Sequence, residues 1–275
     1  MTSAIEYLSK PLPTSMADEW YDFAGTDHFW MEWRLAVVGR ATQNLLPMKP
    51  ALPTFRSLEI GCGNGSFRQQ MESHFGLTVD ACDLNEKALK MAQGGRGRLL
   101  LYNIFDRHPG LLAAYSTVFL MDVIEHIDNA RDFVNAAAAH ARPGGLIVIN
   151  VPALPILYSN YDRVAGHLRR YSRAELRALL ASCGIELVSM TSWGFLMIPV
   201  LFIRKLVGPM IKGSQTIKSG FVPSSKFVDL LLRWLMRLEL SLPVALPVGT
   251  SILMIGRITG QTGVGHDPAG LSASR

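Results

Sequence analysis

Short apolar runs alternate with helix-like stretches from residue 56 to residue 192. The run Leu146–Val151 is apolar on both faces, which is typical of a strand buried inside a parallel sheet. This alternation predicts an α/β fold with helices on both faces of the sheet. We expect strands at 56–60, 77–82, 99–103, 116–121, 146–151, 185–192 and 250–258, and helices at 66–74, 85–93, 129–141 and 172–183.

Local turn signals support these boundaries. Gly76 stands where a C-cap glycine would end a helix, and Asn85 has the side chain of an N-cap. Ser172-Arg173-Ala174-Glu175 has the pattern of a capping box, and Gly184 would close that helix. Arg142-Pro143-Gly144-Gly145 predicts a turn before the fifth strand.

Residues 1–50 form a leader in which aromatic residues crowd positions 20–33. A helix is expected at 29–46, because Pro47 and Pro50 would end it. This helix could pack over the core or close over a ligand site as a lid. We therefore divide the chain into the leader, a main domain at 51–260 and a polar, Gly- and Ser-rich tail at 261–275 that is expected to be disordered.

An apolar and basic insertion at 195–249 separates the last two expected strands. Phe227–Leu238 has nine apolar residues among twelve, and the other three, Asp229, Arg233 and Arg237, share one helix face. Phe195–Ile211 is similarly apolar. Two amphipathic helices with basic rims would suit peripheral membrane contact or a lipid-binding cap. A helical pair packed on the core, or a homodimer interface, is the alternative interpretation.

The composition supports the first interpretation. The chain has 275 residues, of which 49% are hydrophobic and 18% charged, and its mean hydropathy is +0.20. Such a composition excludes a disordered chain and a coiled coil. The insertion holds seven basic and two acidic residues, a surplus that equals the net charge of +5 of the whole chain. Anionic lipid head groups would attract this segment.

Cysteine usage and the chain start favour a cytoplasmic protein, with a peripheral position at the inner face of the membrane as an open alternative. The three cysteines show neither a disulfide framework nor zinc-ligand spacing, so no metal site is expected. The first ten residues lack a basic region followed by an apolar stretch, so no signal peptide is expected. The longest apolar run, Trp193–Ile203, is shorter than the roughly 18 residues that a spanning helix needs.

A glycine-rich turn follows the first expected strand, in the spacing Glu59-x-Gly61-x-Gly63-x-Gly65. Such a turn lets the backbone approach a nucleotide cofactor closely. The dinucleotide motif would require glycine at position 66, where Ser66 stands, and this argues against NAD. Asp83 lies 22 residues after Gly61, where a carboxylate would bind ribose hydroxyls.

These stretches give the chain a resemblance to class I S-adenosylmethionine-dependent methyltransferases. The matching segments are Leu58-Glu59-Ile60-Gly61-Cys62-Gly63-Asn64-Gly65, Asp80-Ala81-Cys82-Asp83, Phe119-Leu120-Met121-Asp122-Val123-Ile124-Glu125-His126 and Arg142-Pro143-Gly144-Gly145. The resemblance implies a Rossmann-like sheet of seven strands, the last one antiparallel, with S-adenosyl-L-methionine as cofactor.

The resemblance also implies roles for individual residues. The turn from Gly61 through Gly63 to Gly65 would hold the methionine part of the cofactor, with Glu59 orienting the turn. Asp83 would bind the ribose. Residues near the adenine would be Asn103 or, as a second candidate, Asp106, and Asp122 would face the methionine amino group or the reaction cleft.

Methyl transfer from a sulfonium needs mainly alignment and exclusion of water, so a general base is optional. His126 follows the fourth strand and is a candidate base, or else a turn residue bonded to the backbone. The segment Gly166-His167-x-Arg169-Arg170-Tyr171 resembles one found in many bacterial methyltransferases. By that resemblance His167, Arg170 and Tyr171 would bind or deprotonate the acceptor, and a solvated basic turn is the alternative.

The leading hypothesis is a methyltransferase that acts on a hydrophobic or membrane-associated acceptor, with oxygen as the methylated atom. One alternative is a methyltransferase for a soluble metabolite that dimerises through 195–249. Another is a non-catalytic cofactor-binding or membrane-scaffolding protein. Nucleic-acid partners are disfavoured, because no Asn-Pro-Pro-aromatic or Asp-Pro-Pro-aromatic motif follows the fourth strand.

Overall fold

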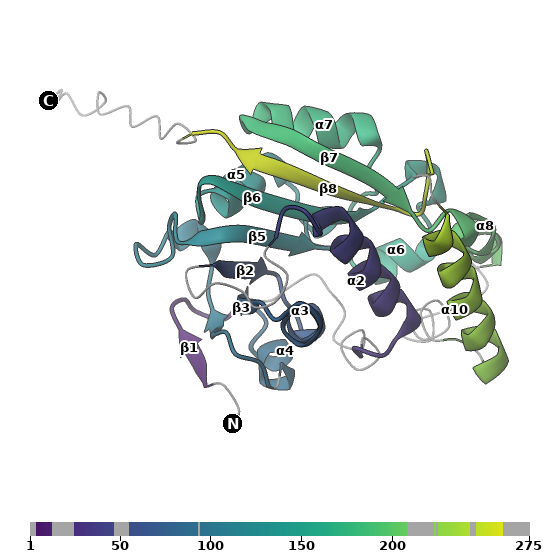
Figure 1. Cartoon of the computed structure of the whole chain (residues 1–275), viewed down its shortest axis with the longest axis horizontal. Helices are drawn as coiled ribbons and strands as arrows, with labels where there is room; N and C mark the ends of the chain where they lie inside the picture. The colour runs from purple at the N-terminus through teal and green to yellow at the C-terminus, as the bar shows by residue number, and fades with distance from the viewer. Residues whose placement is uncertain are drawn as a thin grey trace, which may run out of the picture.

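A computed structural model of the chain describes residues 4–12, 25–46, 55–92, 94–207, 223, 225–242 and 246–260. Its centre is a mixed sheet in the order β1-β4-β3-β2-β5-β6-β8-β7 (Figure 1). The strands are β1 (Ile5–Tyr7), β2 (Arg56–Ile60), β3 (Thr78–Asp83), β4 (Leu99–Leu101), β5 (Tyr115–Met121), β6 (Ala141–Pro152), β7 (Ile185–Trp193) and β8 (Ser251–Ile258).

The strand directions confirm the expected Rossmann-like class. The pairs from β1 across to β6 are parallel, whereas β8 runs antiparallel to both β6 and β7. The expected count of seven strands was wrong by one, because β1 adds an eighth beside β4. This strand is only three residues long, too short for an apolar pattern to reveal it. The expected turn at 142–145 lies within β6, where Gly144 has a φ of 75°.

Helices cover both faces of the sheet (Figure 1). They are α2 (Phe29–Thr42), α3 (Ser66–Phe75), α4 (Glu86–Met91), α5 (Ala130–Ala138), α6 (Asn160–Val164), α7 (Arg173–Ser182), α8 (Ile198–Val207) and α10 (Lys226–Ser241), with 3-10 turns η1 (Ile104–Asp106), η2 (Ile124–His126), η3 (Pro155–Leu157) and η4 (Phe195–Met197). The capping box at Ser172 and Glu175 is present, and Asn85 caps α4 through the backbone N–H of Ala88.

Two apolar layers hold these helices to the sheet. Alternate side chains of β5 point to opposite faces, so Val118 joins one layer with α5 and α7, and Phe119 joins the other with α2 and α3. Trp33 of α2 is fully buried in the second layer. The leader helix α2 is therefore part of the core.

The insertion between β7 and β8 is helical where the structure describes it. It contains η4, α8 and α10, and α10 packs against α2. Within the described residues, no helix is long and apolar enough to cross a membrane. The predicted disordered tail at 261–275, the aromatic residues at 20–23 and the insertion residues 208–222 lie outside the described part.

Candidate active site

A cavity of about 400 Å³ lies at the carboxyl ends of β2, β3, β4 and β5. Ligands of open α/β sheets bind at this edge, and small-molecule sites have volumes of roughly 300–1,000 Å³. Its lining comes from α2 and from the segments that follow these strands: Met31, Arg34, Glu59–Asn64, Ser66, Phe67, Cys82–Leu84, Tyr102–Ile104, Met121–Val123, His126, Ile127 and Phe133.

The glycine turn forms one wall of the cavity, and its geometry requires glycine. Gly61 has a φ of 72°, and a Cβ added there would stand 2.7 Å from Cγ2 of Val123. The backbone N–H of Gly63 donates to Oδ2 of Asp83 over 2.8 Å. Gly65 also has a positive φ, but it precedes α3 and does not line the cavity. This close approach of backbone and carboxylate forms a cradle that a side chain would fill.

Asp83 presents a fixed carboxylate to the cavity. Besides Gly63, the backbone N–H of Asn85 donates to it over 2.9 Å. Burial raises the pKa of Asp83, although these backbone N–H groups favour the charged form. A carboxylate oriented in this way can accept hydrogen bonds from the hydroxyls of a ribose, so the residue fits the predicted role.

Glu59 and Asn103 line the same cavity, whereas Asp106 does not. Burial raises the pKa of Glu59 to about 8, with Arg34 opposing the shift. Asn103 accepts the backbone N–H of Phe105 through Oδ1, over 3.1 Å. Asp106 is exposed on η1 and accepts the hydroxyl of Ser9 over 2.5 Å. Of the two residues predicted near the adenine, the structure brings only Asn103 to the cavity.

Asp122 is held in the cavity wall by Arg34, a residue that sequence reasoning did not select. The Nη1 of Arg34 lies 2.7 Å from Oδ2 of Asp122, and the amide of Asn150 donates to Oδ1 over 2.6 Å. Asp122 has a φ of 60°, which places its carboxylate at the edge of the sheet. The pair of opposite charges fits the carboxylate and ammonium of an amino acid. The only feature of the sequence that could have indicated Arg34 is its position as a single arginine on the apolar side of the expected helix.

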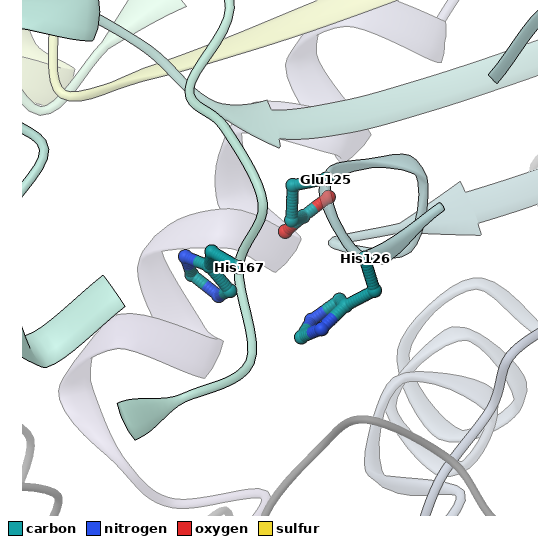
Figure 2. A group of neighbouring side chains, drawn as sticks. All are labelled: Glu125, His126 and His167. Atoms are coloured by element: carbon teal, nitrogen blue, oxygen red, sulfur yellow. The ribbon is translucent and has the colours of Figure 1, made fainter. Parts of the chain in front are cut away.

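His126 and His167, both selected from the sequence, and the buried Glu125 lie close together beside the cavity wall that contains Asp122 (Figure 2). Nδ1 of His126 donates to the carbonyl of Gly166 over 3.0 Å, and its ring lies edge-on to His167, with centroids 4.9 Å apart. Burial, and next His167, lower the pKa of His126 to about 3, so the ring is neutral. Ligand atoms of Glu125, His126 and His167 lie within 4.8 Å of one another, so these three could hold a divalent cation.

A second cavity of about 120 Å³ adjoins the first, and Asp122 lines both. His167 and Arg170 line this second cavity. Tyr171 lines neither of the two cavities, because it is buried and donates its hydroxyl to the carbonyl of Ile124 over 3.0 Å. Burial raises the pKa of Tyr171 to about 12. The structure thus gives Tyr171 a structural contact where sequence reasoning had proposed a catalytic one.

Comparisons with known proteins agree with this geometry. Residues 4–190 match the family described as "Methyltransferase domain". The ubiquinone biosynthesis O-methyltransferase of Thiobacillus denitrificans is 32% identical over 99 residues, which cover 33% of this chain and 41% of that protein. Its counterpart in Xanthomonas euvesicatoria is 24% identical over 195 residues, which cover 63% of this chain and 78% of that protein. The chain therefore spans less than half the length of the first relative.

Solved structures show the same fold. Phosphoethanolamine N-methyltransferase 2 of Haemonchus contortus, in complex with S-adenosyl-L-methionine, has a TM-score of 0.50 at 17% identity, over 82% of this chain and 52% of that one. The matched residues contain the glycine turn and the carboxylates of the first cavity. The chain belongs to the methyltransferase domain family.

Proposed function

We propose that this enzyme transfers the methyl group to a hydroxyl oxygen of a hydrophobic acceptor that it takes from a membrane surface. The observation that carries the proposal is the double role of α8. Leu201 and Arg204 line the second cavity from one face of this helix. Phe202, Ile203 and Leu206 on the other side are 49%, 60% and 64% exposed. One helix therefore links the acceptor cavity to an exposed apolar surface.

Helix α10 extends this surface. Its inward face carries Leu232 and Met236, which are buried in the core. Its outward face is also apolar, because Phe227, Leu230 and Trp234 are 74%, 62% and 57% exposed and follow one another at helical spacing. Transfer of such a side chain out of water contributes roughly 1.5–3 kcal/mol, so a few of them supply substantial affinity for lipid.

The charged residues of the insertion suit an anionic surface. The predicted polar face of α10 is partly turned inward, because Arg233 pairs with Asp229 over 2.8 Å and with Glu32 of α2 over 2.5 Å. Glu239 is buried and accepts the backbone N–H of Gly194 over 2.7 Å. Lys226 and Arg237 are exposed on the same helix. The acidic groups of α10 are thus engaged within the protein, and the cations that reach solvent favour anionic lipid.

The names of the curated relatives support oxygen as the methylated atom, since both are ubiquinone biosynthesis O-methyltransferases. Bound S-adenosylmethionine supplies a methyl group already activated on a sulfonium. The residues Gly61, Gly63, Asp83 and Asn103 would hold it, and Arg34 with Asp122 would fix its amino-acid part. Helix α2 covers both cavities through Met31 and Phe29 and excludes water from the reaction.

We propose His126 as the group that accepts the hydroxyl proton of the acceptor. Its Nδ1 donates to the carbonyl of Gly166, so Nε2 carries the lone pair. The ring lines the cofactor cavity beside Asp122, near the junction of the two cavities. General-base assistance is typically worth 10²–10⁴-fold, but a pKa of about 3 makes His126 a weak base. We therefore expect His126→Asn to lower kcat by about 10²-fold, the low end of that range, with little change in cofactor affinity. If kcat is unchanged, His126 is not a general base, and alignment of the acceptor with the methyl group accounts for the catalysis.

Vesicle flotation tests the membrane part of the proposal. We expect the full-length protein to float with phosphatidylglycerol-containing vesicles and to float less with pure phosphatidylcholine. The triple variant Phe227→Ser, Leu230→Ser, Trp234→Ser should remain in the dense fraction. A matched control, Leu187→Ser with Val188→Ser, removes exposed apolar side chains from the edge strand β7 and should float as wild type does.

The acceptor class is tested with methyl-labelled cofactor and a lipid extract. We expect the label in a lipid-soluble product whose methyl is bound to oxygen. If the protein ignores vesicles, is a dimer and labels only water-soluble metabolites, the apolar surface is a dimer contact and the proposal is wrong.

A further inference from the structure

We infer that Asn150 and Trp193 are positioning residues for S-adenosylmethionine, because they hold Asp122 in the orientation in which it binds the ammonium of the cofactor. This inference rests on the proposed role of Arg34 and Asp122 at the amino-acid part, and it adds two residues that act through Asp122 alone. Both are buried, and neither lines either of the two cavities.

Trp193, Asn150 and Asp122 form a chain of hydrogen bonds that ends at the cofactor cavity. Nε1 of Trp193 donates to Oδ1 of Asn150 over 2.9 Å, and Nδ2 of Asn150 donates to Oδ1 of Asp122 over 2.6 Å. An indole N–H can only donate and an ionised carboxylate can only accept, so a single orientation of the Asn150 amide satisfies both neighbours. The amide therefore cannot turn away from Asp122 without losing both hydrogen bonds.

Asn150 holds the backbone of Asp122 as well. The backbone N–H of Asp122 donates to the carbonyl of Asn150 over 2.9 Å. Asp122 has a φ of 60°, in the left-handed region that residues other than glycine seldom adopt. Such a backbone conformation persists only where the surrounding contacts determine it. Strand β6 thus fixes both the backbone and the side chain of Asp122, just beyond the end of β5.

The carboxylate of Asp122 is shared between two donors. Asn150 donates to Oδ1, and Nη1 of Arg34 donates to Oδ2 over 2.7 Å. A carboxylate oxygen can accept two hydrogen bonds, so each oxygen keeps capacity for a ligand. The side chain of Asp122 is 23% exposed and that of Arg34 only 5%, so the carboxylate is the more open group of the pair.

Loss of the Asn150 amide would change how Arg34 binds this carboxylate. The planar guanidinium of arginine can bind both oxygens of a carboxylate at once. With Oδ1 released, Asp122 would be free to rotate into such a bidentate pair and away from the ammonium of the cofactor. The amide of Asn150 therefore keeps the carboxylate directed at the cavity.

Trp193 connects this chain of hydrogen bonds to the helix that covers the cavities. It is the last residue of β7, and its ring centroid lies 4.6 Å from that of Trp30 and 5.8 Å from that of Trp33. Both of these residues belong to α2, the helix that also carries Arg34. Helix α2 thus supports both donors to the carboxylate, Arg34 directly and Asn150 through Trp193.

S-adenosylhomocysteine and 5′-methylthioadenosine test the inference, because the second has the same adenosine and thioether but lacks the amino-acid part. Calorimetry measures both affinities for the full-length protein. Asn150→Leu should weaken S-adenosylhomocysteine about tenfold, the effect of one hydrogen bond to a charged group, and leave 5′-methylthioadenosine as in wild type. A merely structural role for Asn150 would weaken both ligands equally. That result, or unchanged affinity for both, overturns the inference.

Trp193→Phe tests the outer end of the chain, because it keeps an aromatic ring and removes the indole N–H. It should weaken S-adenosylhomocysteine by about threefold, since a hydrogen bond between neutral groups contributes less, and leave 5′-methylthioadenosine unchanged. This variant carries the test if Asn150→Leu does not fold. Equal loss for both ligands, or no loss for either, contradicts the role of Trp193.

The control Thr42→Val removes another buried hydrogen bond of the same layer. The hydroxyl of Thr42, on α2, donates to the carbonyl of Val38 over 2.7 Å and does not reach the carboxylate. Both affinities should equal those of wild type. A selective loss of S-adenosylhomocysteine affinity in this control would show that any weakening of α2 has this effect, and would overturn the inference.

Asp122→Asn separates this inference from the assignment on which it rests. If it weakens S-adenosylhomocysteine and not 5′-methylthioadenosine, while Asn150→Leu does neither, only the positioning inference is wrong. If Asp122→Asn changes neither affinity, the proposed role of Asp122 is wrong and the inference falls with it. These titrations contain neither vesicles nor acceptor, so failure of the membrane-derived acceptor is observed separately.

Discussion

Two carboxylates at neighbouring strand ends differ in what surrounds them. Asp83 is fixed by the backbone N–H groups of Gly63 and Asn85 and faces the cofactor cavity. Asp106 is exposed and accepts a hydroxyl from Ser9. The same functional group therefore lines a cavity at one position and makes a surface contact at the other. Substitution at both positions separates these roles.

Asp83→Asn is expected to weaken binding of S-adenosylmethionine by about 10- to 100-fold, because a hydrogen bond to a charged group contributes roughly 1.5–3 kcal/mol. Isothermal titration calorimetry measures this change. The control Asp106→Asn should bind the cofactor as wild type does. If both variants lose affinity equally, or if neither does, the assignment of Asp83 is wrong.

Gly61→Ala is expected to cost about 2–5 kcal/mol of unfolding free energy, since left-handed backbone costs roughly 1–2 kcal/mol and overpacking costs roughly 1–3 kcal/mol. The added Cβ would meet Val123 at 2.7 Å. Gly144 has a φ of 75° and nothing within 4 Å of an added Cβ, so Gly144→Ala should carry only the backbone cost. Urea denaturation that gives equal losses would contradict the close contact at Gly61.

The sequence predicted residues that a local motif positions and missed those that tertiary contacts position. Gly61 and Gly63 lie in the turn after β2, and Asp83 ends β3. The spacing of a βαβ unit brings the turn and the strand end together. Arg34 reaches Asp122 across 88 positions of the chain, which no spacing indicates. Tyr171 stood in a polar motif, but its burial became visible only in the fold.

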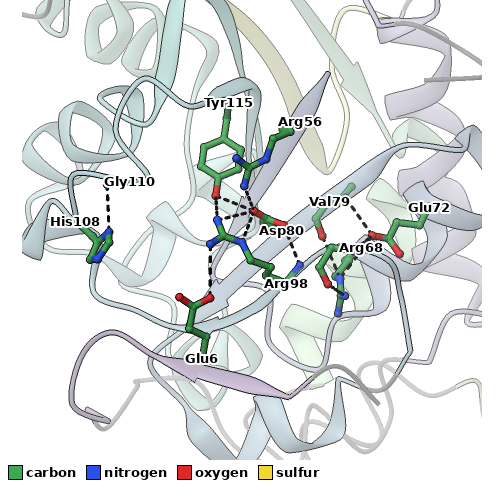
Figure 3. A network of polar contacts seen from close by, with 11 residues as sticks. Glu6, Arg56, Arg68, Glu72, Val79, Asp80, Arg98, His108, Gly110 and Tyr115 are labelled. Atoms are coloured by element: carbon green, nitrogen blue, oxygen red, sulfur yellow. Dashed lines mark hydrogen bonds and ion pairs between the residues drawn. The ribbon is translucent and has the colours of Figure 1, made fainter. Parts of the chain in front are cut away.

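At the scale of elements, a buried carboxylate ties four strands together (Figure 3). Asp80 of β3 accepts Arg56 of β2 over 2.7 Å, Arg98 before β4 over 2.9 Å and the hydroxyl of Tyr115 of β5 over 2.9 Å. Arg98 also lies 3.6 Å from Glu6 in the added strand β1. Burial alone would raise the pKa of Asp80, but hydrogen bonds from Arg98 and Arg56 outweigh it and lower the pKa.

Asp80→Asn is expected to lower the unfolding free energy by about 2 kcal/mol at pH 7, since the arginines keep partial exposure to water. The folded-state pKa lies below the ordinary value of 3.8, so the stabilisation is present above that value and is lost as the pH falls through the folded pKa. Urea denaturation at pH 7 and near pH 3 should show the difference between wild type and variant shrink.

Tyr115→Phe is the matched control for this network. It removes two hydrogen bonds, one to Asp80 and one from Arg98, and keeps every charge. About 1–3 kcal/mol should therefore be lost, and the pH dependence should be retained. A difference between wild type and Asp80→Asn that stays constant across the pH range would contradict the ion-pair account.

Strands that have a clear apolar pattern in the sequence were predicted close to their observed bounds. The strands β2, β5 and β8 lie within about one residue of the expected ranges, because apolar runs bounded by turn residues identify buried strands. The strand β1 was missed, since its pairing with β4 and not its own pattern defines it. The two amphipathic helices of the insertion were expected from the sequence, but the sequence does not show that α10 packs against α2.

At the scale of the whole molecule, the sheet brings both cavities to one edge, and helices from the two ends of the chain close them. Helix α2 precedes the sheet in the sequence, and α8 and α10 follow β7, yet α2 and α10 lie in contact (Figure 1). Ligand binding should therefore stabilise the entire fold. The resemblance implied the Rossmann-like class and the antiparallel last strand, whereas nothing in the sequence indicated this closure by distant helices.

S-adenosylmethionine at a hundredfold excess over its Kd is expected to add about 2.7 kcal/mol to the unfolding free energy. At roughly 2–4 °C per kcal/mol for a chain of this size, Tm should rise by about 5–10 °C. Differential scanning calorimetry measures the shift, with Asp83→Asn as the variant in which the same concentration should give a smaller one. A shift of equal size in the variant would place the binding site elsewhere.

The most direct measurement is a calorimetric titration of the full-length protein with S-adenosylmethionine and, separately, with NAD. The cradle of Gly61, Gly63 and Asp83 predicts one molecule of S-adenosylmethionine bound per chain and no binding of NAD. Absence of S-adenosylmethionine binding, or equal affinity for NAD, would contradict the assignment of this cavity to the methyl donor.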